Sequence, residues 1–137
     1  MTNPLKIKLC SITLDSADSN ALADFYAALL GWEKNSTTPE FIGVSVPGEV
    51  PVLWFQQVQS YRPPVWPEEP GAQQTMVHLD FVVDDIGKAI QHALDCGAAK
   101  SPKQYHSDRW TVMFDPAGHP FCLAEYPAFF EKDKGTG

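Results

Sequence analysis

The sequence predicts an α+β protein built from two β-α-β-β-β modules. Three observations carry this prediction. A helical apolar pattern occurs twice, an alternating strand pattern precedes each copy, and three shorter strand signals follow each copy. Turn residues punctuate both copies, with Pro47-Gly48 in the first half and Asp115-Pro116-Ala117-Gly118 in the second. The chain is therefore expected to fold as two copies of one unit.

The two expected helices have the same start and stop signals. Asp18 and Asp85 stand where a side chain can accept hydrogen bonds from free backbone N–H groups at a helix start. Gly31 and Gly97 stand where the left-handed conformation closes a helix. In each segment between the aspartate and the glycine, apolar residues recur at positions i, i+3, i+4, i+7 and i+8. This spacing places one apolar stripe along each helix.

A strand is expected to lead into each helix, over LKIKLCSITLD in the first half and TMVHLDFVVDD in the second. Side chains alternate between the two faces of a strand, so the uniformly apolar set should face the helix. Ser11 and His78 belong to the opposite set and should point away from the helices. The alignment of Asp18 with Asp85 matches these two residues to each other.

Each helix is followed by three short strand signals. They are Trp32-Glu33-Lys34, EFIGVSV and PVLWFQQV in the first half, and AAKSPK, RWTVMFD and PFCLAEY in the second. An alignment of Pro51 with Pro120 matches Gln56 to Glu125 in the last strands. By this alignment, Gln56, His78 and Glu125 all lie on the face opposite the helices.

We expect one domain over residues 1–137, which is within the usual size of a single domain. Module one spans about 5–57, a connector 58–74, module two 75–127 and a tail 128–137. The four prolines of YRPPVWPEEPG make the connector stiff, and its Tyr61 and Trp66 are expected to pack on the surface of the fold or on a partner subunit.

Composition excludes several function classes. The chain is 44% hydrophobic but has no apolar run near the roughly 20 residues of a membrane-spanning helix, and its start shows no signal peptide. The net charge of −7, with no basic stripe, argues against nucleic-acid binding. Three scattered cysteines indicate a reducing compartment, hence a cytoplasmic protein, and are expected to be small buried apolar residues. They are Cys10, Cys96 and Cys122.

The segments ADFYAALLGWE, VHLDFVVDDIGKAIQHALDCGA and WTVMFDPAGHPFCL resemble the vicinal oxygen chelate superfamily, which includes glyoxalase I, bleomycin-resistance proteins and extradiol dioxygenases. Within it, the chain is most similar to glyoxalase-like domains of uncharacterised bacterial proteins, from about Ile7 to Tyr126 without the connector. The resemblance implies a curled mixed sheet around a cleft, a small-molecule ligand and a homodimer. It specifies the fold better than the reaction.

The resemblance also implies a metal site, carried over to four positions of this chain. His78, Glu125 and Gln56 would ligate one divalent ion of zinc, nickel, manganese or iron, whereas Ser11 stands where metal-binding members usually have histidine. A metal-free pair of His78 and Glu125 remains the alternative. Extradiol dioxygenase activity is disfavoured because the four positions contain one histidine.

Two functions therefore stay open. The first is a metal-dependent lyase or isomerase acting on vicinal oxygens, with Glu125 or His106 moving the proton. The second is a metal-free protein that sequesters an aromatic metabolite or antibiotic. The candidate substrate-binding residues are Ser11, Trp54, Trp110 and Phe121, although core packing is the simpler role for the two tryptophans and a solvated loop position for His106.

Overall fold

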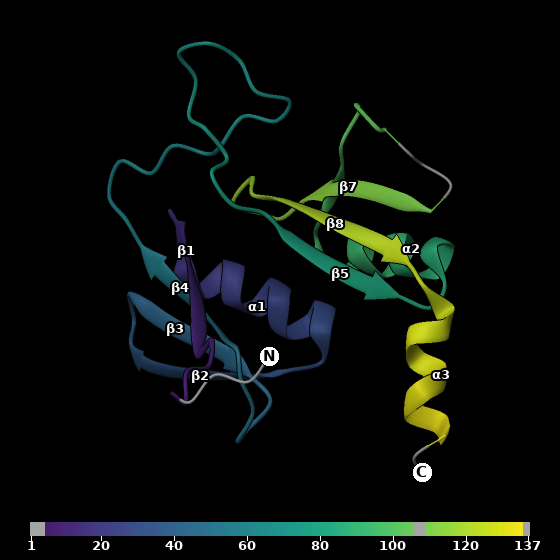
Figure 1. The fold of residues 1–137 in the computed structure, drawn as a ribbon. Helices are drawn as coiled ribbons and strands as arrows, with labels where there is room; N and C mark the ends of the chain where they lie inside the picture. The colour runs from purple at the N-terminus through teal and green to yellow at the C-terminus, as the bar shows by residue number, and fades with distance from the viewer. Residues whose placement is uncertain (1–4, 106–108, 136–137) are drawn as a thin grey trace. The chain divides into compact units, whose positions relative to one another are not determined.

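A computed structural model describes residues 5–105 and 109–135 of the chain (Figure 1). The chain divides into two compact units, residues 1–61 and 62–137. Each unit contains one β-α-β-β-β module, so the repeat and the α+β class read from the sequence are confirmed. The four connector residues 58–61 belong to the first unit and the rest of the connector to the second.

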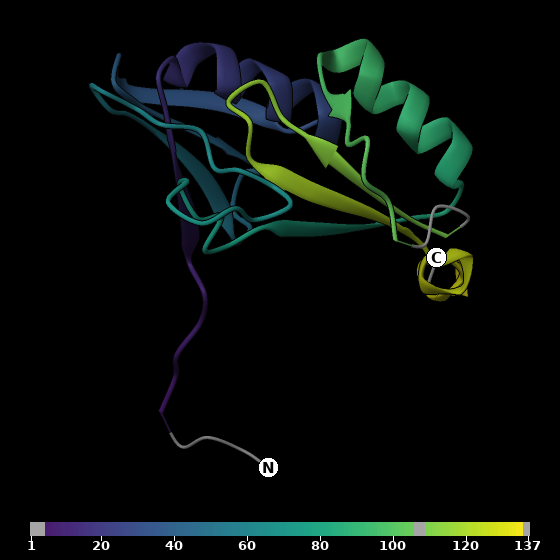
Figure 2. The same ribbon diagram turned by 90° about the horizontal axis from the view of Figure 1, so that it is seen from above.

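The first unit is a four-stranded mixed sheet covered on one face by a helix (Figure 2). The strand order is β1-β4-β3-β2, with β1 parallel to β4 and the other neighbours antiparallel. The elements are β1 (Ser11–Ser16), α1 (Ser19–Leu30), β2 (Glu33–Thr38), β3 (Phe41–Ser45) and β4 (Val52–Gln57).

The second unit repeats this topology with strand order β5-β8-β7-β6, and β5 runs parallel to β8. Helix α2 covers one face of its sheet (Figure 2). The elements are β5 (Leu79–Val83), α2 (Ile86–Cys96), β6 (Ala99–Lys100), β7 (Trp110–Phe114), β8 (Pro120–Glu125) and α3 (Pro127–Gly135).

The helix boundaries follow the capping residues that the sequence indicated. The side chains of Asp18 and Asp85 each accept a 3.0 Å hydrogen bond from a backbone N–H three residues later. Gly31 and Gly97 close the helices at φ of 70° and 118°, in the left-handed region that favours glycine.

Aromatic side chains form the centre of the first unit. Tyr26 on α1 and Phe55 on β4 are fully buried, and their rings stack at a centroid distance of 5.3 Å. On the other face of the sheet, Trp54 stacks on Phe41 at 4.7 Å and lies over Gly43, where a Cβ atom would come within 2.8 Å of the indole. The absence of a side chain at Gly43 therefore lets Trp54 lie flat on the sheet.

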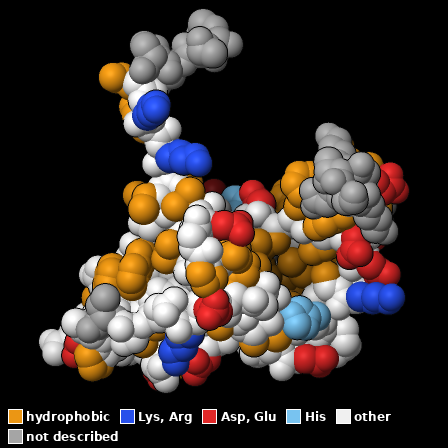
Figure 3. All heavy atoms as spheres, turned by 90° about the horizontal axis from the view of Figure 1, so that it is seen from below, with side chains coloured by type: hydrophobic (Ala, Val, Ile, Leu, Met, Phe, Trp, Pro, Cys, Tyr) orange, Lys and Arg blue, Asp and Glu red, His pale blue; other side chains and the backbone are white. Residues whose placement is uncertain are grey.

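The first expected strand is shorter than its alternating pattern. Strand β1 begins at Ser11, while residues 5–10 form an exposed arm (Figure 3). Leu5, Ile7 and Leu9 are 67%, 75% and 63% exposed, so the alternation there has no sheet face to cover. Alternation predicted a strand, but a strand also needs a neighbour, and pairing with β4 begins at Cys10, whose backbone carbonyl accepts a 2.8 Å hydrogen bond from Val52.

The expected tail contains a third helix, since α3 starts at Pro127 within the last residues of the chain. Proline at a first helical position needs no intrahelical N–H partner. Among the described residues, no helix has the length and apolar character required to cross a membrane.

Candidate functional site

His78 and Asp80 form the polar centre of the site in the second unit. They stand two residues apart at the start of β5, so strand alternation places both on one face. His78 Nε2 lies 3.2 Å from an Asp80 carboxylate oxygen, and both side chains are partly open to solvent. The orientation of His78 away from α2 is the one that the sequence indicated.

Cys122 is the third member of this group. Asp80 and Cys122 are directly paired in the parallel ladder of β5 and β8, which brings the thiol under the His78–Asp80 pair. One ligand-type atom from each of His78, Asp80 and Cys122 lies within 4.8 Å of the other two. The thiol itself is buried. A nitrogen, an oxygen and a sulfur thus converge from two neighbouring strands.

The Cys122 thiol holds its proton strongly. Burial raises its pKa from the ordinary 9.0 to about 11, a hydrogen bond with Trp110 opposes this shift, and the Asp80 carboxylate adds to it. Because the thiolate is the nucleophilic form of cysteine, Cys122 is an unreactive thiol near neutral pH.

Alkylation by iodoacetamide at pH 8 is therefore expected to be at least about 100-fold slower at Cys122 than at exposed Cys10. A rise in pKa from 9.0 to about 11 lowers the thiolate fraction about 100-fold at this pH, and burial slows access further. Time-resolved peptide mass spectrometry measures both rates. In urea the two rates should converge, and equal rates in the folded protein would contradict the burial of Cys122.

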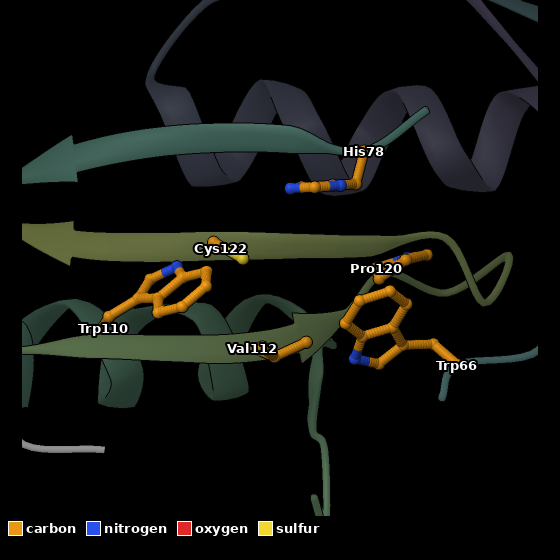
Figure 4. Close-up of a pocket in the computed structure, with 6 residues that line it drawn as sticks. All are labelled: Trp66, His78, Trp110, Val112, Pro120 and Cys122. Carbon is orange, nitrogen blue, oxygen red and sulfur yellow. The ribbon is translucent and has the colours of Figure 1, made fainter. Parts of the chain in front are cut away.

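An apolar chamber of about 70 Å³ adjoins this group. Figure 4 shows the side chains that line it on the side of the sheet away from α2, with Trp110 and Trp66 toward opposite ends. Cys122 lies between them and His78 supplies the polar group. The lining residues are Trp66, His78, Trp110, Val112, Pro120 and Cys122.

The structure corrects the face of Glu125. Its carboxylate accepts a 2.9 Å hydrogen bond from the backbone N–H of Ile86, the first residue of α2. It thus lies on the helix side of β8, whereas Pro120 and Cys122 line the chamber on the other side. A carboxylate at a helix N-terminus is stabilised by the free N–H groups and the helix dipole. Glu125 is engaged there, and its assignment as metal ligand or catalytic base stays an untested prediction.

The wrong face follows from a one-residue error in aligning the repeats. In the first unit, it is Gln57 that accepts a hydrogen bond, at 3.3 Å, from Ser19, the first residue of α1. Gln57, not Gln56, is therefore the counterpart of Glu125. Aligning Pro51 with Pro120 shifted β4 by one position, and a one-residue shift moves every side chain of a strand to the other face.

Phe121 lies on the same face of β8 as Glu125, and its assignment to the ligand site stays a prediction. It was expected to line the ligand site, but it is fully buried and its ring packs at 5.9 Å against Phe81. Its neighbour Cys122 lines the chamber instead.

The remaining predicted site residues fall outside this group. Ser11 begins β1, and Gln56 shares a face with Trp54, all within the first compact unit. Their participation in one site with His78 stays a prediction. Trp54 packs on Phe41, and this contact already occupies one of its ring faces. His106 lies outside the described residues.

Sequence reasoning missed Trp66, Asp80 and Cys122 as site residues. Trp66 was expected to pack on the surface of the fold or on a partner subunit, without a role in the site; its ring lies 6.3 Å from His78 and forms one wall of the chamber. Strand alternation already placed Asp80 on the same face as His78, so the sequence contained a signal that Asp80 belongs to the site. The correct pairing of β5 with β8 would have indicated Cys122.

Comparison with known proteins gives one consistent result for the fold. A family model described as "Glyoxalase-like domain" matches residues 11–124. None of the curated protein sequences matches this chain.

Solved structures of similar fold include a glyoxalase/bleomycin resistance/dioxygenase family enzyme from Burkholderia phytofirmans PsJN (TM-score 0.61, 19% identity, 87% of this chain and 98% of that chain). Another is TnmS3, an antibiotic binding protein from Streptomyces sp. CB03234 (TM-score 0.58, 18% identity, 90% and 98%). A third is a glyoxalase family protein from Enterococcus faecalis (TM-score 0.59, 23% identity, 86% and 97%).

Proposed function

The chain belongs to the glyoxalase-like domain family, and from that premise we propose that it binds a small aromatic molecule in the apolar chamber beside His78. The observation that carries this proposal is the pair of indoles, Trp66 and Trp110, that border one chamber around Cys122. Mostly apolar pockets with a few polar groups are the usual form of small-molecule sites.

The polar groups of the site support binding that does not depend on a metal ion. His78 and Asp80 already satisfy each other at 3.2 Å. Cys122 is a protonated thiol near neutral pH, and Glu125 caps α2. The fold offers a precedent, since the similar structure TnmS3 is described as an antibiotic binding protein.

Chelator-treated protein tests this proposal. Ethylbenzene and acetophenone, titrated into it and followed by NMR, are expected to shift the Trp66 and Trp110 indole signals in a saturable way. Trp110→Ala should weaken binding about tenfold because it removes the stacking surface. Phe129→Ala, which truncates a half-exposed ring on α3, is the matched control and should bind as the wild type does. Absence of saturable binding by both probes would refute the proposal.

A second candidate function is metal-dependent catalysis, favoured by the group of His78, Asp80 and Cys122. An imidazole, a carboxylate and a thiolate suit zinc, and three protein ligands with an open position are typical of catalytic zinc. A bound ion would supply Lewis-acid polarisation of vicinal substrate oxygens. The raised pKa of Cys122 opposes this function because the thiol must lose its proton to ligate.

Zinc uptake decides between the two candidates. Under the metal-dependent candidate, equilibrium dialysis against zinc sulfate gives one equivalent of zinc, with affinity that rises with pH as Cys122 loses its proton. Under the metal-free proposal, uptake stays far below one equivalent while ethylbenzene and acetophenone still bind.

A further inference from the structure

The exposed arm that precedes β1 carries one apolar row and one basic row of side chains. Leu5, Ile7 and Leu9 alternate with Lys6 and Lys8, and the three aliphatic side chains are exposed. Figure 2 shows the arm running outward from β1 as an extended chain. Successive side chains of an extended chain point to opposite faces, so the arm has an apolar face and a basic face.

The backbone of the arm is open to a partner. No backbone hydrogen bond joins Lys6, Ile7, Lys8 or Leu9 to any other residue that the structure describes. An extended segment with free N–H and C=O groups can add itself as a strand to the open edge of a sheet. The arm is therefore a strand without a sheet.

Strand β5 offers an open edge of matching length. It is the outermost strand of its sheet and pairs with β8 alone among the described strands. The Val83 carbonyl accepts a 2.8 Å hydrogen bond from the Tyr126 N–H, so every second residue of β5, counted from Val83, directs its backbone groups to β8. The N–H and C=O groups of Asp80 and Val82 thus point to the open edge. The strand spans five residues, as does the arm over residues 5–9.

The helix side of this edge suits the apolar face of the arm. Leu79, Phe81 and Val83 are only half-buried there, whereas Phe121 and Leu123 on the neighbouring strand β8 are buried. The apolar layer beneath α2 is thus incomplete at its β5 edge. A further strand with its aliphatic row on this side would extend the layer and remove that row from water.

The same placement brings the basic face of the arm beside carboxylates. Because side chains alternate, an arm with its aliphatic row on the helix side presents Lys6 and Lys8 on the side of Asp80. The Asp80 side chain is 63% exposed, and Asp84, which directly follows β5, is exposed as well. Opposite charges on neighbouring strands attract each other. One orientation of the arm therefore satisfies both of its faces.

We propose that the arm of one molecule adds as a strand to the β5 edge of a second copy of this chain, and that the two copies exchange arms in a two-fold symmetric dimer. Within one copy, the arm pairs with neither described sheet. The lysines of the partner's arm lie beside the carboxylate that pairs with His78, so each copy adds charge to the rim of the other's candidate site.

The other open edges fit the arm less well. Strand β6 has two residues, and β2 is the polar segment EKNSTT. Strand β1 has serine at both ends, and its Leu14 is already buried. Two arms laid side by side would bring lysines of like charge together.

Sedimentation velocity of the full chain over a dilution series tests the dimer. The triple variant Leu5→Ser, Ile7→Ser and Leu9→Ser should weaken dimerisation at least about 100-fold, because it exposes no new core surface but removes the aliphatic row. Val50→Ser with Phe129→Ser is the matched control, since it removes two exposed apolar side chains outside the arm and β5. The control should dimerise as the wild type does. A wild-type protein that stays monomeric throughout the series overturns the proposal.

Charge reversal identifies the edge that receives the arm. Lys6→Glu with Lys8→Glu puts like charges into both exchanged contacts, and so does Asp80→Lys with Asp84→Lys. Each double variant alone should dimerise at least about tenfold more weakly than the wild type. An equimolar mixture of the two should dimerise again, because both contacts of the mixed dimer then join opposite charges. A mixture as dissociated as its separate components, or double variants that dimerise as the wild type does, would show that the arm does not bind the β5 edge of a second copy.

Discussion

Replacing Phe121 by alanine is expected to lower the free energy of unfolding by about 3–5 kcal/mol. The Phe121 ring has no exposed surface and packs edge-on against Phe81 at 5.9 Å, on the side of the sheet that α2 covers. Truncation removes the buried ring and leaves a cavity that close-packed neighbours fill only in part. Urea unfolding followed by circular dichroism gives the change as a shift of the midpoint at constant slope.

Two further variants make this prediction specific. Phe129→Ala removes a ring that is 47% exposed and should cost no more than about 1 kcal/mol. Phe121→Leu keeps most of the buried volume, so it should cost less than the alanine variant and leave acetophenone binding unchanged. Weakened ligand binding in Phe121→Leu at retained stability would instead support the original assignment of Phe121 to the ligand site.

The fold was predictable because its signals are local. Asp18 and Gly31 each act through one hydrogen-bonding group or one backbone conformation within a few residues of the helix end. The same holds for Asp85 and Gly97. Such contacts depend on sequence spacing alone. Because the same signals occur at equivalent places in both halves of the chain, they were enough to predict the repeat and the α+β class.

The faces of the last strands were harder to predict because they depend on register. Alternation correctly grouped Glu125 with Phe121 in one set and left Cys122 in the other. Alternation alone does not show which of these two sets of side chains faces the helix. The alignment of Pro51 with Pro120 placed Glu125 on the face opposite the helix, which was wrong. The structure resolves this through two contacts distant in sequence, Glu125 with Ile86 and Gln57 with Ser19. Long-range hydrogen bonds of this kind leave no periodic trace in a sequence.

The connector was the least predictable part of the site. Its prolines predict a stiff segment, but stiffness does not specify a direction. The position of Trp66 depends on the contact of Pro63 with Gly118, 55 residues apart by their numbers, and on the neighbouring ring of His78. A sequence reading therefore places an aromatic residue in the connector without assigning it to a chamber.

Glu125 provides the last and most discriminating prediction, because two roles for it give opposite results. Glu125→Ala removes the acceptor for the first free N–H group of α2 and should lower the free energy of unfolding by about 1–2 kcal/mol. Any zinc that the wild-type protein binds should be retained by this variant within about threefold in affinity. The carboxylate lies on the side of β8 opposite to Cys122, so it does not belong to the group that includes His78.

Cys122→Ser and His78→Ala should behave in the reverse manner. Each removes one of the three converging ligand atoms, so zinc affinity should fall by more than about 100-fold, beyond the 10- to 100-fold typical of outer-shell changes. Zinc titration with a competing chromophoric chelator measures affinity, and urea unfolding of the same samples measures stability. Loss of zinc in Glu125→Ala together with unchanged stability would restore Glu125 as a ligand. Lower stability of Glu125→Ala with zinc binding retained would identify Glu125 as the cap of α2. Any zinc bound at the site would then be held by His78, Asp80 and Cys122.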